Sequence, residues 1–104
     1  MDKEFIKERV ATIRNSKNIS ARSLSLNLGM SSEYVNQVEN GRLMPSLDFI
    51  MNFCDYFNIS VGEFFDEKVK YPNQYKDLIK ELNKLSQPEL QQIIDLVKLI
   101  NNKK

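Results

Sequence analysis

Apolar residues recur at helical spacing along most of this chain. In residues 5–17 the side chains of Phe5, Ile6, Val10 and Ile13 fall on one face of a helix. Similar stripes predict helices at residues 21–28, 32–39, 46–57, 60–65 and 73–84 and, after a cap at Ser86, a last helix to about residue 100. The pattern therefore predicts an all-α protein.

The second and third predicted helices are short and closely spaced. Leu24 and Leu28 lie four residues apart on the first of them, and Val35 and Val38 lie three apart on the second, so each offers a narrow apolar stripe. Gly29 falls between them, where a tight turn favours a positive φ. This pattern predicts a helix-turn-helix, whose second helix has the size and shape to enter a DNA major groove.

Serine and glycine mark the predicted helix ends. Ser20 and Ser31 are placed as N-caps of the two motif helices, and Gly41 follows the second as a C′ residue. Ser46 is predicted to cap the fourth helix, and Ser60 opens the fifth in a capping box. The inner stripe of the fourth helix is predicted to consist of Leu47, Ile50, Met51, Cys54 and Phe57.

The chain divides into three predicted parts. Residues 1–66 form a five-helix unit, residues 67–74 a polar linker that contains Pro72, and residues 75–104 a two-helix hairpin. The last helix carries a broad apolar face made of Leu90, Ile93, Ile94, Val97 and Ile100. One short neighbouring helix cannot cover this face, so it packs either on the five-helix unit or on its copy from another chain.

Composition excludes several classes of chemistry. The chain of 104 residues has no histidine and one cysteine, which rules out a catalytic imidazole and a zinc finger. We therefore expect no enzymatic activity and no cofactor. No apolar run is long enough to cross a membrane, and the lone Cys54 suits a reducing compartment, so we expect a cytoplasmic protein. The net charge of +1 lacks the excess of basic residues that is typical of nucleic-acid-binding proteins. Binding to nucleic acid would therefore depend on a few basic or polar side chains placed to contact phosphates.

More than half of the chain resembles the Cro/repressor-type helix-turn-helix family, also called the XRE family. The matching elements are Arg14, Ser20, Leu24, Leu28-Gly29, Val35, Val38-Glu39-Asn40-Gly41, Pro45-Ser46-Leu47 and the stretch from Ile59 to Phe65. The resemblance implies a five-helix, lambda-repressor-like DNA-binding domain. It further implies a transcriptional regulator, in most cases a repressor, that binds operator half-sites on double-stranded DNA as a homodimer.

By this resemblance, the base-reading positions hold Ser32, Glu33, Asn36 and Gln37. The Gln37 amide can pair with adenine N6 and N7, whereas Ser32 discriminates little between bases. The Glu33 carboxylate can accept from cytosine N4, but it also repels phosphates; alternatively, it is a solvated carboxylate at the helix start.

The resemblance also places phosphate contacts at Arg22, Tyr34, Asn40 and Arg42. For Arg22 and Arg42 the alternative is a surface charge without a partner, and for Tyr34 a ring that only covers the helix surface. In relatives, the residues that match Arg14 and Glu39 form a structural ion pair, so the same pair is expected here.

Two residues depart from the family pattern. Relatives often have a phosphate-binding glutamine where this chain has Ala21, so one DNA anchor is lost. Ser25 replaces a usual alanine where the motif helices touch, and its hydroxyl is expected to bond to a carbonyl one turn earlier. Ala21, Glu33 and the near-neutral charge leave a second hypothesis open: a protein-interaction module that keeps the fold without operator binding. Under the first hypothesis, the C-terminal helical pair supplies the dimer contact or a binding site for a regulatory protein.

Overall fold

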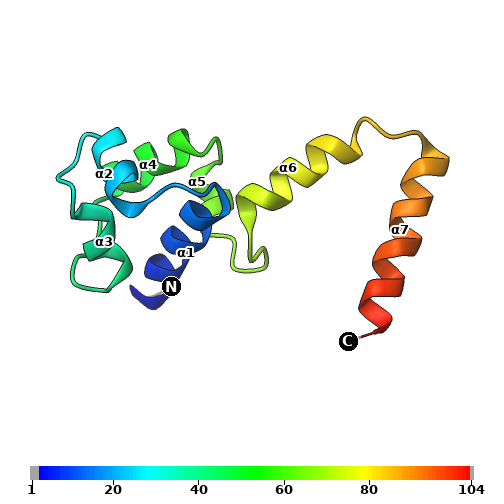
Figure 1. Ribbon diagram of the computed structural model, residues 1–104, viewed down its shortest axis with the longest axis horizontal. Helices are drawn as coiled ribbons and strands as arrows, with labels where there is room; N and C mark the ends of the chain where they lie inside the picture. The colour runs from blue at the N-terminus through cyan, green and yellow to red at the C-terminus, as the bar shows by residue number, and fades with distance from the viewer. Residues whose placement is uncertain (1–2, 104) are drawn as a thin grey trace.

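The computed structural model describes residues 3–103, and this part of the chain consists of helices and connecting turns without a strand (Figure 1). The helices are α1 (Lys3–Ser16), α2 (Ala21–Asn27), α3 (Tyr34–Glu39), α4 (Leu47–Tyr56), α5 (Val61–Phe64), α6 (Pro72–Leu82) and α7 (Gln87–Asn102). The all-α prediction is confirmed. The predicted domain ends, residues 1 and 104, lie outside the described residues, and the domain division remains a prediction.

Helices α1–α5 pack around one hydrophobic core. Its largest fully buried side chains include Phe53, Phe64, Ile13 and Leu24. The ring of Phe53 lies 4.8 Å from that of Phe57 and 5.8 Å from that of Phe64, which joins α4 to α5. Burial also raises the pKa of the Cys54 thiol to about 11, so this cysteine is a protonated core residue.

The predicted inner stripe of α4 was partly wrong. Leu47 and Met51 are 63% and 48% exposed, whereas Phe49 and Phe53 are buried. Both stripes are apolar, so helical periodicity alone could not choose between them. In the structure Phe49 and Phe53 are the buried pair. Their rings pack at a tilt against each other, and that of Phe49 also packs against Tyr34.

The predicted start of α3 was also wrong. The helix begins at Tyr34 rather than at residue 32, and Glu33 is its N-cap without a side-chain hydrogen bond. Ser31 contributes its carbonyl oxygen, which accepts from the Tyr34 amide (3.1 Å). The other predicted caps, Ser20, Ser46, Ser60 and Ser86, are confirmed.

Both predicted glycine turns are confirmed. Gly29 has φ +74° and Gly41 has φ +81°, a region that other residues adopt only with strain.

Helix α6 begins at Pro72, one residue before its predicted start, and its first turn is anchored to α1. Asn73, in its first turn, is 2% exposed and donates to the Ile13 carbonyl oxygen (3.3 Å) and to the Ser16 hydroxyl. The buried Arg9 donates to the carbonyl oxygens of Asp66 (2.9 Å) and Val69 (2.6 Å). Together these bonds fix the connection between α5 and α6.

Helix α7 lies apart from the five-helix unit (Figure 1). It follows α6 after a turn at residues 83–86, and the two helices diverge instead of lying along one another. None of its residues is buried, and large apolar side chains such as Ile94 and Ile100 are exposed. Among the described helices, none combines the length and apolar character that a membrane span requires.

Candidate nucleic-acid interface

The two helices of the motif are joined through a buried serine. The Ser25 hydroxyl donates to the Ala21 carbonyl oxygen (2.8 Å), as predicted, and it accepts from the Val35 backbone amide (3.0 Å). The second bond satisfies an amide in the first turn of α3 that no cap reaches. Ser25 therefore fixes the start of α3 on α2, a role that the sequence pattern did not reveal.

The other end of α3 is held by an ion pair with α1. Arg14 donates from Nε to Glu39 Oε2 (2.6 Å) and from Nη2 to Glu39 Oε1 (2.8 Å), while Nη1 donates to the Ile19 carbonyl oxygen (2.8 Å). The two side chains are only 15% and 14% exposed. The hydrogen bonds to Glu39 raise the pKa of the Arg14 guanidinium. The arrangement is bidentate, so it fixes orientation as well as position.

Three of the four predicted base-reading side chains are exposed on α3 and its leading turn. Glu33, Asn36 and Gln37 face solvent, whereas Ser32 is half-buried. None of the four side chains makes a hydrogen bond or ion pair with another described residue. The structure therefore leaves these polar groups free for an external partner.

The predicted phosphate contacts occupy different surroundings. Arg22, in the first turn of α2, and Arg42, in the loop after α3, are exposed, and their guanidinium groups have no partner among the described residues. The Asn40 side-chain oxygen accepts from the Arg42 amide (3.1 Å), so it shapes this loop. The Tyr34 ring packs 4.7 Å from the Phe49 ring and is half-buried, and its hydroxyl makes no hydrogen bond within the described chain.

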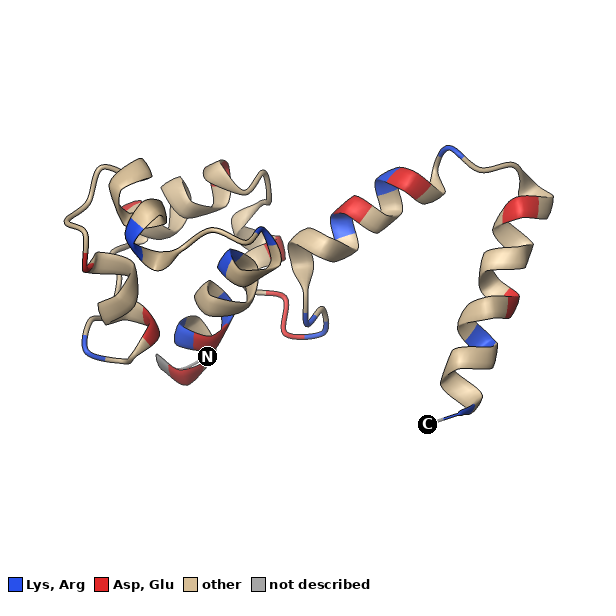
Figure 2. Ribbon diagram, in the orientation of Figure 1, with Lys and Arg blue, Asp and Glu red and all other residues tan. Residues whose placement is uncertain are grey.

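Charges near α3 are mixed in sign (Figure 2). Glu39 is neutralised by Arg14, which leaves Glu33 as the free carboxylate beside α3. The sequence analysis missed Lys7 of α1, which lies beside Gly41, where an added Cβ would be 3.8 Å from Lys7 Cδ. Its ammonium group is paired with the Glu4 carboxylate (3.3 Å), so it adds no uncompensated charge. Only the tertiary packing of α1 against the loop brings Lys7 there, so no local motif could have found it.

The groups exposed around α3 are polar and charged. Within residues 3–103, no three or more histidine, cysteine, aspartate or glutamate side chains gather to hold a metal ion. The described face instead presents amide, carboxylate and guanidinium groups on a helix supported from both ends, which suits contacts to base edges and phosphates.

Comparison with known proteins places this geometry in a family. Residues 10–64, about half of the chain, match the family model described as helix-turn-helix, and the match runs from α1 to the end of α5. No curated protein and no solved structure gave a match. The chain therefore has a DNA-binding domain and belongs to the helix-turn-helix family of the Cro/repressor (XRE) type.

Proposed function

We propose that this protein is a sequence-specific transcriptional repressor that binds operator half-sites as a homodimer. The observation that carries the proposal is the free polar face of α3, with Glu33, Asn36 and Gln37 exposed on a helix that Ser25 and Arg14 hold in place. In this mode one α3 enters each of two major grooves, with half-sites about 10 base pairs apart.

Affinity and specificity come from different residues in this proposal. Arg22 and Arg42 contact phosphates and make binding salt-dependent, since each contact releases counterions. Asn36 and Gln37 contact base edges, where an amide pairs best with adenine. The Glu33 carboxylate accepts a hydrogen bond from cytosine N4, and its negative charge disfavours positions of the duplex that bring a phosphate close to it.

Selection from random duplexes, followed by anisotropy titration at several salt concentrations, tests this function. We expect Gln37→Ala to weaken binding to the selected site by about 1–3 kcal/mol and to relax its preference at one position. We expect Arg42→Gln to weaken binding to all sequences and to reduce the salt slope by about 1. The matched control is Gln74→Ala on α6, an exposed glutamine outside the proposed DNA and dimer contacts, which leaves both quantities unchanged. Binding without preference across the library would reject operator recognition.

The C-terminal helices supply the dimer contact in this proposal. Residues 75–104 associate through Leu90, Ile93, Ile94, Val97 and Ile100 of α7, of which Leu90, Ile94, Val97 and Ile100 are among the exposed large apolar side chains. Light scattering tests this: Ile94→Glu gives a monomer, whereas Gln92→Glu, which adds the same charge on the same helix, leaves the dimer intact. A dimer that survives Ile94→Glu would place the contact elsewhere.

A second function is favoured by the same exposed helices. A protein-interaction module would use α6 and α7 to bind a partner, and the loss of the phosphate anchor at Ala21 and the free Glu33 carboxylate both disfavour DNA. The selection experiment separates the two functions, because only the repressor enriches a sequence.

A further inference from the structure

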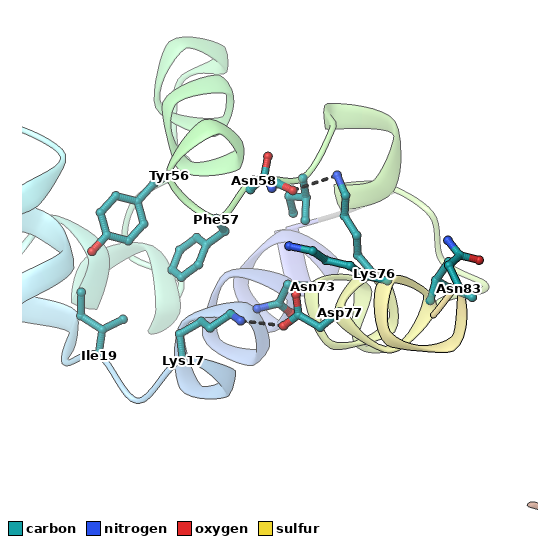
Figure 3. A pocket seen from close by; sticks show the side chains of 12 residues that line it. Lys17, Ile19, Tyr56, Phe57, Asn58, Asn73, Lys76, Asp77 and Asn83 are labelled. Carbon is teal, nitrogen blue, oxygen red and sulfur yellow. Dashed lines mark hydrogen bonds and ion pairs between the residues drawn. The ribbon is translucent and has the colours of Figure 1, made fainter. Parts of the chain in front are cut away.

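A cleft of about 800 Å³ lies away from α3, between the end of α4 and helix α6 (Figure 3). Residues 56–59 form one wall, and the face of α6 that runs from Asn73 to Asn83 forms the other. Lys17 and Ile19 line it from the chain segment that follows α1. Clefts that bind small molecules in proteins have volumes of about 300–1,000 Å³, so this one is large enough for such a ligand.

The charged side chains of the cleft are mostly basic. Lys17 is paired with Asp77 (2.7 Å), and Lys76 donates to the Asn58 carbonyl oxygen (2.9 Å), as the dashed lines in Figure 3 mark. Lys80 also lines the cleft and makes no hydrogen bond or ion pair within the described residues. Lys76 also lies 3.5 Å from Glu63 Oε1, so Lys17 and Lys76 each have an acidic partner. Lys80 therefore supplies the uncompensated positive charge that favours an anion in the cleft.

The cleft also contains a buried polar atom without a partner. Asn73 lines the cleft, and in Figure 3 it lies between Lys17 and Lys76. The Asn73 amide nitrogen donates to Ile13 and Ser16, but its Oδ1 accepts no hydrogen bond. A buried amide oxygen normally has a donor, and its absence among the described residues marks a position for a donor from outside the chain, directly or through one water.

The remaining lining is apolar. Phe57 and Ile59 are buried in the domain core and Ile79 is partly exposed on α6, so their side chains offer a surface for a hydrophobic group. We propose that the cleft binds a small organic anion that has an apolar body and a hydrogen-bond donor. The anionic group contacts Lys80, the apolar body lies on Phe57 and Ile79, and the donor satisfies Asn73 Oδ1.

The fluorescent anion 8-anilinonaphthalene-1-sulfonate, which combines a sulfonate, aromatic rings and an N–H donor, is a suitable probe for the whole chain. We expect saturable binding that Lys80→Gln weakens about fivefold, because a charge-assisted contact is lost. Lys80 is exposed, so this variant keeps the fold. The matched control is Lys98→Gln, which removes one charge beside the exposed apolar face of α7 and leaves the affinity within about twofold.

Amide chemical shifts locate the bound probe independently. On addition of the probe, we expect the largest shifts at residues 17–19, 56–59 and 73–83, with a separate shift of the Asn73 side-chain amide. Shifts that gather on α7, or equal losses in Lys80→Gln and Lys98→Gln, would show adsorption to exposed apolar surface and reject the site. Absence of saturable binding would reject it as well.

Discussion

Helices α4 and α7 are both amphipathic, but their surroundings differ completely. Helix α4 buries Phe49, Ile50, Phe53 and Cys54 in the core of the helix-turn-helix domain, residues 10–64. Helix α7 is longer, opens with a capping box, and buries none of its residues. The buried hydrophobic residues of the described chain all lie between Val10 and Phe64, whereas most of its exposed large hydrophobics lie at or beyond Tyr71.

The difference separates what forms a helix from what stabilises it. Helices α2 and α3 have only seven and six residues and would not persist alone, yet they are held by the core and by Ser25. Helix α7 has the capping box and apolar periodicity that favour a helix, but it buries no residue against the rest of the chain. A single amphipathic helix of this length has only marginal stability in water. The apolar face of α7 therefore gains most from association, which supports the proposed dimer.

The largest predicted effect contrasts one core residue with one α7 residue. Phe53→Ala should lower the free energy of unfolding of the domain by about 3–5 kcal/mol, because it removes a fully buried ring in contact with three others. Leu96→Ala should change it by less than about 0.5 kcal/mol, because that side chain is exposed. Urea denaturation at a low protein concentration measures both.

Similar losses in the two variants would mean that α7 is part of the cooperative unit. A loss in Leu96→Ala that appears only at high protein concentration would instead belong to association, since dimer stability depends on concentration.

The second prediction concerns the support of α3. Glu39→Ala should destabilise the domain by about 3 kcal/mol, because it leaves the largely buried Arg14 guanidinium without its carboxylate. The control is Glu33→Ala, which removes a carboxylate that makes no hydrogen bond and should change stability by less than about 0.5 kcal/mol. Equal losses of stability in the two variants would show that the ion pair between Arg14 and Glu39 does not stabilise the packing of α3 on α1.

The same comparison explains what the sequence could predict. Caps and turns depend on a few neighbouring residues, so Ser20, Ser46 and Ser60 and the left-handed Gly29 were identified correctly. The helix-turn-helix followed from the combination of these signals with helical periodicity, and the family match bears it out.

Features that depend on packing could not be predicted in this way. The choice of Phe49 over Leu47 for the core was made by aromatic neighbours from α3 and α4 that sequence spacing does not reveal. The anchors Arg9 and Asn73 bond to backbone carbonyl groups about 60 residues away, and a carbonyl acceptor leaves no signature in sequence. At the candidate interface, the residue types alone predicted which face of α3 is exposed. The sequence did not show that the Ser25 hydroxyl bonds to both Ala21 and Val35.

A third prediction tests how the two regions are joined. Asn73→Ala removes both bonds from the α6 side chain to α1, so the first turns of α6 should open more easily. Losing about 1 kcal/mol of local stability makes amide exchange there about fivefold faster, as hydrogen exchange can measure. Exchange within α4 should stay unchanged, and Gln74→Ala, at an exposed neighbouring position, is the matched control. Unchanged exchange in α6 would mean that Arg9 and the connection after α5 hold the helix without Asn73.

The smallest predicted effect is a pH dependence at the Ser60 capping box. Glu63 Oε1 accepts from the Ser60 amide (2.8 Å), and this bond lowers the pKa of the Glu63 carboxyl in the folded state. Its contribution is therefore present above the unfolded pKa of about 4.3 and is lost as the pH falls through the lower folded value. The carboxylate is 40% exposed, so solvent screening keeps this contribution below about 0.5 kcal/mol.

Glu63→Gln separates the capping bond from the charge. Glutamine also serves at this position of a capping box, but it does not titrate. Between pH 6 and pH 3, the thermal midpoint of this variant should fall slightly less than that of the unmodified chain. Glu8→Gln removes an exposed carboxylate that makes no bond within the described residues, so its midpoint should follow the unmodified chain. If Glu63→Gln also follows it, the acid sensitivity of the domain does not arise from the Ser60 capping box.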